Sequence, residues 1–134
     1  MKQKLFWDKK YEIGNTEIDF EHQIFLSLIQ KIDNAFSDNY DNEFILLLIK
    51  ELYKYADFHF ISEENRMIFS EYPDYKSHKE EHSELLSELN QKISYFDLKF
   101  INQDKLITFL FSWFINHTTT SDLKFGNHLK DIKA

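Results

Sequence analysis

The chain has 134 residues, of which 43% are hydrophobic and 17% aromatic, so it has enough apolar side chains for the core of a single domain. Its net charge of −7 argues against nucleic acid as a partner, because phosphate contacts need clustered lysine and arginine. The absence of cysteine excludes disulfides, thiolate metal sites and cysteine nucleophiles, and the presence of only two glycines and one proline disfavours all-β folds and phosphate-binding loops.

The N-terminal residues 1–18 are predicted to form an extended arm. Trp7, Tyr11 and Ile13 are apolar without a helical period, and a turn follows at Gly14. We expect Trp7 to pack this arm against the rest of the molecule. The sequence begins without an apolar leader and holds no apolar run of membrane-spanning length, so we expect a cytoplasmic protein that does not use a membrane.

Four segments with apolar side chains at three- and four-residue steps follow the arm and predict amphipathic helices. They cover residues of about 20–36, 43–69, 74–96 and 104–122. Asp19 is expected to cap the first helix, and Gly126 is expected to stop the last one and leave a polar tail at 126–134. Long helices with short connections predict an all-α, antiparallel up-down four-helix bundle that occupies the whole chain, 1–134, as one domain.

Five of the six histidines fall on the apolar stripes of these predicted helices. His22 lies near the start of the first helix, His59 toward the end of the second and His117 near the end of the fourth. His78 and His82 lie near the start of the third. In an up-down bundle these four helix ends lie at the same level, so the five imidazoles are predicted to converge in the core.

Two carboxylates are expected to join the histidines. Glu63 follows His59 by four residues, which places both side chains on one helical face. Asp122 follows His117 by five residues, and on a regular α-helix that step turns the side chain by roughly 140°, away from the core. For both to face inward, the helix must end, loosen or carry a π-type turn across the intervening "TTTS", whose residues are mediocre helix formers.

Such a polar group in the core points to metal binding. A single histidine on an apolar face is more often a core residue held by a hydrogen bond, but burying seven polar side chains together is costly unless each has a partner, and a metal supplies one for all of them. Seven ligands exceed the four that a structural zinc takes and suit two ions bridged by carboxylates, with one position left open. Imidazole and carboxylate without sulfur favour iron, manganese or zinc. A ferritin-like centre is disfavoured because no histidine here has glutamate three residues before it.

The stretch "HKEEH", His78 to His82, also fits the H-x-x-E-H pattern of zinc proteases, with Glu81 as the general base. That alternative leaves the histidines of the other three helices unexplained. Another alternative is a metal-free bundle that binds a protein partner. Glu64 and Glu81 are expected on solvated helix faces, with a hydrogen bond to a ligand imidazole left open, and His128 is expected to be exposed in the tail.

From Trp7 to about Asp122 the chain resembles the hemerythrin family, and within it the single-domain bacterial hemerythrins. The landmarks that carry the resemblance are Trp7, "IDFEH" ending at His22, "HFISEE" from His59, "YP" from Tyr72, "HKEEH" from His78, and "WFINHTTTSD" from Trp113 to Asp122. Each is short, but their combined spacing is specific.

The resemblance implies a non-haem di-iron centre, with iron as Fe²⁺ or Fe³⁺, that binds O2 reversibly. By this resemblance, one coordinatively full iron is held by His78, His82 and His117, and the other, with an open position for O2, by His22 and His59. Glu63, Asp122 and an oxo or hydroxo group are expected to bridge the two ions. The O2 pocket is expected to be apolar and dry, with a wall of Phe25, Phe60, Trp113 and Phe114, and with Ile115 as a further candidate.

We therefore expect an O2 carrier, store or delivery protein rather than an enzyme, and a monomer, with oligomers left open. The alternatives are a di-iron enzyme that handles peroxide or nitric oxide, and a module that senses O2 or the redox state. A histidine-rich shell carries little negative charge, which favours keeping ferrous iron and releasing O2 intact.

Overall fold

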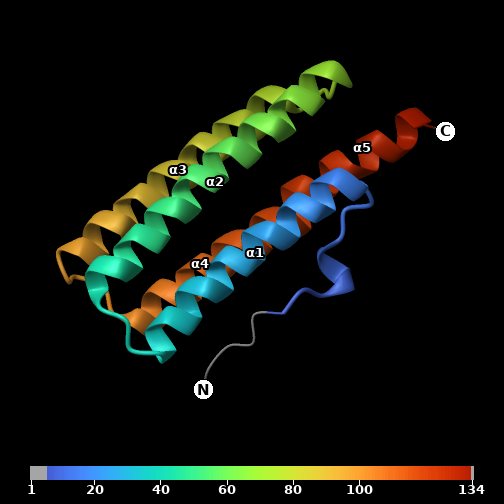
Figure 1. The fold of residues 1–134 in the computed structure, drawn as a ribbon. Helices are drawn as coiled ribbons and strands as arrows, with labels where there is room; N and C mark the ends of the chain where they lie inside the picture. The colour runs from blue at the N-terminus through green and yellow to red at the C-terminus, as the bar shows by residue number, and fades with distance from the viewer. Residues whose placement is uncertain (1–5, 134) are drawn as a thin grey trace.

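Four long rods of helix, each antiparallel to its neighbours, make up the computed structural model, which describes residues 6–133 (Figure 1). The elements in chain order are the short 3-10 helix η1 (Lys9–Tyr11), α1 (Thr16–Ser37), α2 (Asn42–Phe69), α3 (Tyr75–Asp97), α4 (Gln103–His117), the π-helix η2 (Thr118–Asp122) and α5 (Leu123–Lys133). The helices α4 and α5 continue each other through η2 and together form the fourth rod. The prediction of an all-α four-helix bundle is confirmed.

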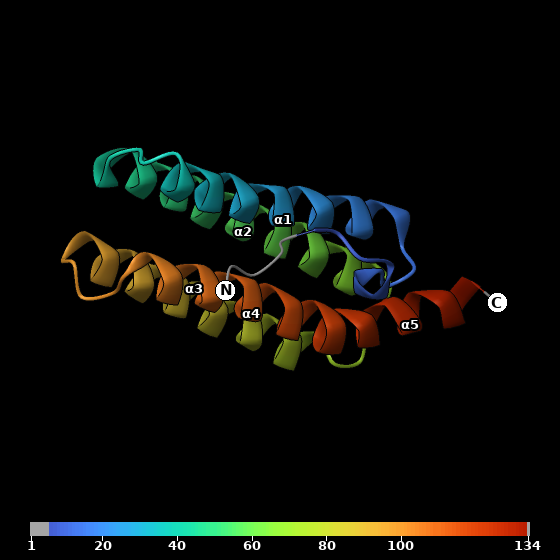
Figure 2. The same ribbon diagram turned by 90° about the horizontal axis from the view of Figure 1, so that it is seen from below.

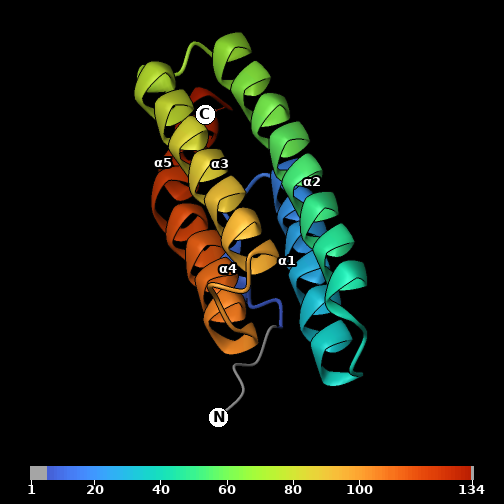
Figure 3. The same cartoon turned by 90° about the vertical axis from the view of Figure 1, so that its left-hand side faces the viewer.

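Each rod of the bundle packs against two neighbours. Seen from below, α1 and α2 lie over α4 and α3 (Figure 2). The α2–α3 turn and α5 lie at one end of the bundle, and the α1–α2 and α3–α4 turns lie at the other (Figure 3). This topology brings the start of α1, the end of α2, the start of α3 and the end of α4 to the same end, as the sequence predicts. Among residues 6–133, no helix combines the length and the hydropathy that a membrane span requires.

The N-terminal arm ends sooner than predicted, because α1 begins at Thr16. Asn15, and not Asp19, caps this helix, with its side-chain oxygen accepting a hydrogen bond from the backbone N–H of Ile18 at 3.0 Å. Asp19 instead binds the backbone of the N-terminal arm. Its two carboxylate oxygens accept hydrogen bonds from the backbone N–H groups of Ile13 and Gly14, at 2.7 and 3.2 Å, and so fasten the arm to the first turn of the helix.

The arm also contacts the bundle through its apolar side chains. Trp7 is half-buried, packs against the main core and meets the ring of Tyr11 edge-on, with ring centroids 5.6 Å apart. The packing role predicted for Trp7 is thus confirmed. Ile13 is buried beside Phe125 of α5 in a second, smaller apolar cluster, whose other members are Ile18, Met67 and Tyr72.

The predicted polar tail is wrong, because residues 123–133 form the helix α5. Gly126 does not stop this helix. A Cβ atom at Gly126 would lie only 2.3 Å from the carbonyl oxygen of Ile13, so the glycine allows the arm to pass close to the helix. The helix continues because Phe125 and Leu129 give it an apolar side that packs on the smaller cluster. His128, expected to be exposed, is half-buried, and its Nε2–H donates to the backbone carbonyl of Ser70 at 2.9 Å.

The close approach of Ile13 predicts that Gly126→Ala destabilises the protein. Replacing glycine by alanine inside an exposed helix normally gains about 1 kcal/mol, but here the added methyl group must displace backbone, and we expect a net loss of about 1–3 kcal/mol. Urea unfolding of this variant beside Asn127→Ala, an exposed site in the same helix, measures the difference. A Gly126→Ala protein as stable as wild type would contradict this packing.

Candidate metal centre

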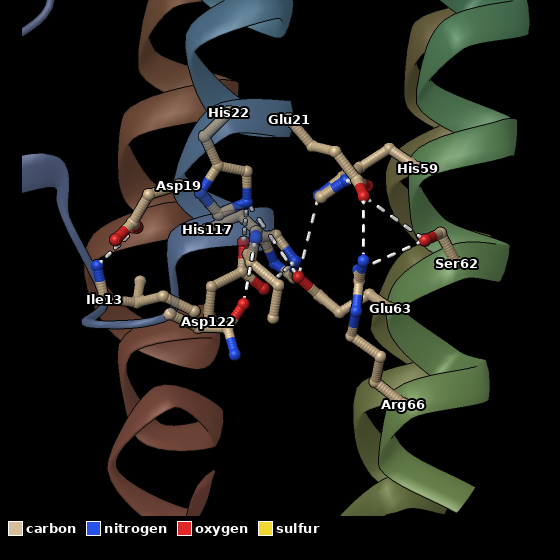
Figure 4. Close-up of polar contacts among 12 residues, drawn as sticks. Ile13, Asp19, Glu21, His22, His59, Ser62, Glu63, Arg66, His117 and Asp122 are labelled. Atoms are coloured by element: carbon tan, nitrogen blue, oxygen red, sulfur yellow. Dashed lines mark hydrogen bonds and ion pairs between the residues drawn. The ribbon is translucent and has the colours of Figure 1, made fainter. Parts of the chain in front are cut away.

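All seven predicted donor side chains are buried in the bundle core at its α2–α3 end, and none is more than 6% exposed. His22 comes from α1, His59 and Glu63 from α2, His78 and His82 from α3, His117 from the last residue of α4, and Asp122 from the last residue of η2. Four rods therefore contribute to one cluster, which the structure brings together as the sequence predicts. Figure 4 shows several of these side chains directed toward one another across the core.

The π-helix η2 turns Asp122 into the core. It spans Thr118–Asp122 and follows His117 without a break, so of the three alternatives left open at "TTTS" (an end, a loosening or a π-type turn) the structure has the π-type turn. The wider turn places Asp122 Oδ1 3.0 Å from His117 Nε2, although a five-residue step on an α-helix would separate the two. The hydroxyl groups of Thr119 and Thr120 donate to the carbonyls four residues earlier, which satisfies backbone acceptors in this stretch.

The donor atoms form two groups that share both carboxylates. The larger group has five members: Glu63, His78, His82, His117 and Asp122. The smaller group has four: His22, His59, Glu63 and Asp122. Within each group the donor atoms lie within 4.8 Å of one another, which is close enough for a single cation to reach all of them.

Glu63 directs one oxygen to each group. Its Oε1 lies 3.1 Å from Nε2 of both His78 and His82. Its Oε2 lies 3.6 Å from Nε2 of His59 and 3.9 Å from Nε2 of His22. The carboxylate therefore stands between the two groups of imidazoles.

Asp122 divides its oxygens in the same way. Its Oδ1 lies 3.0 Å from Nε2 of both His78 and His117, and its Oδ2 lies 3.1 Å from Nε2 of His22. Two carboxylates that each face two groups of imidazoles have the arrangement needed to bridge two cations.

Three of the imidazoles are oriented by carboxylates outside the cluster. In each pair the ring Nδ1–H donates to a glutamate: His59 to Glu21 at 2.7 Å, His82 to Glu64 at 2.8 Å and His117 to Glu81 at 2.6 Å. A proton held on Nδ1 leaves the lone pair on Nε2, on the inner side of each ring, which is the tautomer that a metal ligand needs.

The solvated position expected for Glu64 is wrong, since its side chain is 15% exposed, whereas Glu81 keeps 38% of its side chain exposed. The hydrogen bond to a ligand imidazole that the prediction left open is present at both. Each of these glutamates adjoins a donor of its own helix in sequence, yet it reaches the imidazole of a neighbouring helix. Glu21, which sequence reasoning missed, follows the same rule, since it precedes His22 and binds His59. A glutamate next to one donor in each of the first three helices was therefore the available signal, but its target depends on how the helices are rotated against one another.

The inner ring nitrogens and the carboxylate oxygens of the cluster lie close together, and too few of them carry a proton for all to form hydrogen bonds. Nε2 of His82 lies 3.1 Å from Nε2 of His117, and in the tautomers above both atoms carry lone pairs. Among the described residues, the inner nitrogen atoms of His22 and His59, both oxygens of Glu63 and Oδ2 of Asp122 have no partner with hydrogen-bond geometry. Unpaired buried polar atoms are rare, and either protons or cations must lie among these. The donor set thus fits a two-metal centre.

Without metal, the carboxylates attract protons to the imidazoles. Burial alone lowers the pKa of an imidazole, but the adjacent Asp122 and Glu63 raise the pKa of His78 to about 9. Burial is likewise outweighed at His117, where Asp122 and Glu81 raise the pKa to about 10. Burial raises the pKa of a carboxyl group, yet the surrounding imidazoles hold the pKa of Glu63 below its usual value and the pKa of Asp122 well below.

A small cavity adjoins the cluster. It is lined by His22, Phe25, His59, Phe60, Leu85, Trp113, Phe114, His117, Thr118 and Asp122. The four aromatic residues predicted for a pocket wall all line it, whereas Ile115 does not, and sequence reasoning missed Leu85 and Thr118. The cavity offers about 10 Å³ to the centre of a water-sized molecule, which is the room that roughly one such molecule needs.

Residues 14–129 match the protein family described as "Hemerythrin HHE cation binding domain". The chain belongs to the hemerythrin family. It is 29% identical to a bacteriohemerythrin of Clostridium acetobutylicum, in a match that covers 89% of this chain and 96% of that protein. It is also 29% identical to a hemerythrin-like protein of Naegleria gruberi, over 89% of this chain and 88% of the other. With a hemerythrin of Themiste dyscrita it shares 27% identity, over 89% of this chain and 88% of that protein.

This hemerythrin-family domain is expected to show a pH-dependent stability that metal abolishes. In the metal-free protein, His78 and His117 contribute stability that is complete below the ordinary histidine pKa of about 6.5 and is lost as the pH rises through about 9 to 10. Glu63 and Asp122 contribute stability that is lost as the pH falls below about 4. Urea unfolding between pH 6 and 10 should therefore show a decline without metal and a flatter profile with it, and a flat metal-free profile would argue against these proton sites.

The hydrogen bond from His117 predicts that Glu81→Ala weakens metal retention. Loss of such an outer partner typically costs about 10–100-fold in metal affinity. Glu80→Ala is the matched control, because Glu80 is exposed on the same turn of α3. Metal content after dialysis against graded chelator concentrations compares the two variants. Equal retention by both would show that the Glu81 contact does not support the site.

Proposed function

We propose that this chain binds O2 reversibly at two irons held by the two donor groups, as a carrier, store or delivery protein. The observation that carries the proposal is the unequal number of imidazoles on the two sides of the shared carboxylates. Glu63 and Asp122 belong both to a group with three imidazoles and to a group with two. Family membership supports a di-iron interpretation of these groups.

The two groups differ by one protein donor, which would leave one metal ion with a free position for a ligand. His78, His82 and His117 with the two shared carboxylates give five protein donors on one side. His22 and His59 with the same carboxylates give four on the other. If one solvent-derived oxygen bridges the ions, the first side reaches six donors and the second reaches five. The second side then retains one position for a small ligand.

The position of the cavity supports the same assignment. Its lining includes both His22 and His59, but only His117 of the three histidines in the larger group. A small molecule in this cavity would therefore lie at the four-donor group, where the free position is expected.

Ferrous iron in the two groups would supply the electrons that reversible O2 binding requires. The side chains around the cavity serve a separate purpose, which is to keep water and acids away. Apart from the donors, the lining consists of four aromatic rings, Leu85 and Thr118. The room for roughly one water-sized molecule leaves little space for solvent beside a diatomic ligand. A dry, apolar surrounding slows proton delivery, and that favours release of the ligand unchanged.

The test is anaerobic loading with Fe²⁺, followed by metal analysis and absorption spectra as O2 is added and then removed under vacuum. We expect two irons per chain, a visible band that appears with O2 and its disappearance on evacuation. His59→Ala should abolish the band, and His128→Ala, a half-buried histidine outside the cluster, should preserve it. Rapid irreversible oxidation with turnover of an added reductant would favour an enzyme, and one zinc in a colourless protein would end the proposal.

A surface groove between α3 and α4 adjoins the cavity. The groove and the cavity share three lining residues, Leu85, Trp113 and His117. The indole Nε1–H of Trp113 donates to the backbone carbonyl of Leu85 at 3.1 Å and holds the two helices together at this point. Leu85 therefore stands between the groove and the cavity.

We expect Leu85→Ala to accelerate both O2 release and irreversible oxidation several-fold, because the smaller side chain admits ligand and water more freely. Leu86→Ala is the matched control, since Leu86 packs on the same core and lines neither hollow. Stopped-flow absorption measures the O2 release rate, and the slow loss of the oxygenated spectrum measures oxidation. Unchanged rates in Leu85→Ala would indicate another route.

A further inference from the structure

The two donor groups differ in the charge that surrounds them, beyond the difference in donor number. In the five-donor group, His82 and His117 each donate to a glutamate. Glu81 is held further by the Ser121 hydroxyl, at 2.9 and 2.7 Å from its two oxygens. Within the part of the chain that the structure describes, no lysine or arginine forms an ion pair with Glu64 or Glu81. Neither of these negative charges is therefore offset by a cationic side chain among the described residues.

The four-donor group has a different surrounding, which Figure 4 shows. Glu21 Oε1 accepts from His59, while Glu21 Oε2 lies 3.1 Å from the Arg66 guanidinium and 3.4 Å from the Ser62 hydroxyl. Arg66 is 24% exposed, and its other carboxylate partner, Glu17, is 77% exposed. The Nδ1 atom of His22 has no hydrogen-bond partner among the described residues.

This arrangement changes how strongly each side can hold a cation. A carboxylate that accepts a hydrogen bond from an imidazole raises the basicity of the opposite ring nitrogen, and so strengthens the metal bond. A guanidinium beside that carboxylate offsets its charge and reduces the effect. The charge of Glu17 cancels little of the Arg66 charge, because a largely exposed carboxylate is screened by water. The five-donor group thus has two outer carboxylates without a cationic partner, Glu64 and Glu81. The four-donor group has one, Glu21, whose charge Arg66 offsets.

We infer that Arg66 is a positioning residue that offsets the charge of Glu21 and so further weakens the His22–His59 group, which also has one donor fewer, as the weaker of two unequal metal sites. The five-donor group fills first and the four-donor group second. The inference rests on the proposed two-metal centre. It concerns what Arg66 does for that centre, through Glu21 and His59, without itself touching a metal.

The experiment is a Co²⁺ titration of the metal-free protein, followed by calorimetry and by visible absorption. Wild type should bind two Co²⁺ per chain in two steps whose affinities differ by about 10-fold or more. Glu64→Gln should weaken the tighter step, which assigns that step to the five-donor group. Arg66→Gln should tighten the weaker step several-fold, so that the two affinities converge, and leave the tighter step unchanged.

Two controls separate charge from structure. Arg66→Lys keeps the positive charge and should restore the wild-type separation of the two steps. Glu17→Gln removes the exposed partner of Arg66 and should leave both steps unchanged. Thermal unfolding of each metal-free variant reports any general loss of stability, which would not by itself tighten a metal site.

The outcomes distinguish the inference from the proposed function. Binding of fewer than two Co²⁺ by wild type would overturn the two-metal centre itself. Two Co²⁺ of equal affinity, an effect of Glu64→Gln on the weaker step alone, or an Arg66→Gln protein whose weaker step stays constant or weakens would each overturn the inference. Equal behaviour of Arg66→Gln and Arg66→Lys would also overturn it.

Discussion

Two buried carboxylates that face imidazoles on both sides are the interaction on which the rest of this structure depends. Glu63 and Asp122 are no more than 1% exposed, and ionised groups in such positions are very costly without partners. Their partners must come from all four rods of the bundle. The lengths of the helices, the direction in which each runs and the level at which they meet all have to agree before the carboxylates can be accommodated.

The apolar parts of the molecule are arranged around this polar centre. On one side the rings of Phe60 and His82 stack at 4.0 Å, and Phe25 and Phe114 meet the imidazoles edge-on as part of the main core. On the other side the ring of His78 approaches Tyr72 and Phe125 of the smaller cluster. The polar cluster therefore lies between two apolar ones, and the arm and α5 complete the second of them.

The sequence was sufficient for features that depend on periodicity and topology. Helical spacing located the histidines on inner faces, and an up-down order brought them to one level. The five-residue step from His117 to Asp122 required a departure from the regular α-helix, of which a π-type turn was one alternative. It was insufficient where the outcome depends on contacts between elements. Gly126 signals a helix end in isolation, but the passage of Ile13 gives it another role. The partners of Glu21 and Glu81 depend on the rotation of neighbouring helices, which no local pattern records.

The π-helix η2 has a consequence for the molecule beyond the orientation of Asp122. Its wider turn shifts the phase of everything that follows, so the faces of α5 point where an uninterrupted α-helix would not direct them. In that shifted phase Phe125 reaches the smaller cluster and Gly126 meets the arm. One extra residue in a turn therefore fixes both the position of the Asp122 donor and the contact between Gly126 and Ile13 of the arm, so the packing of the arm and the geometry of the polar centre are linked.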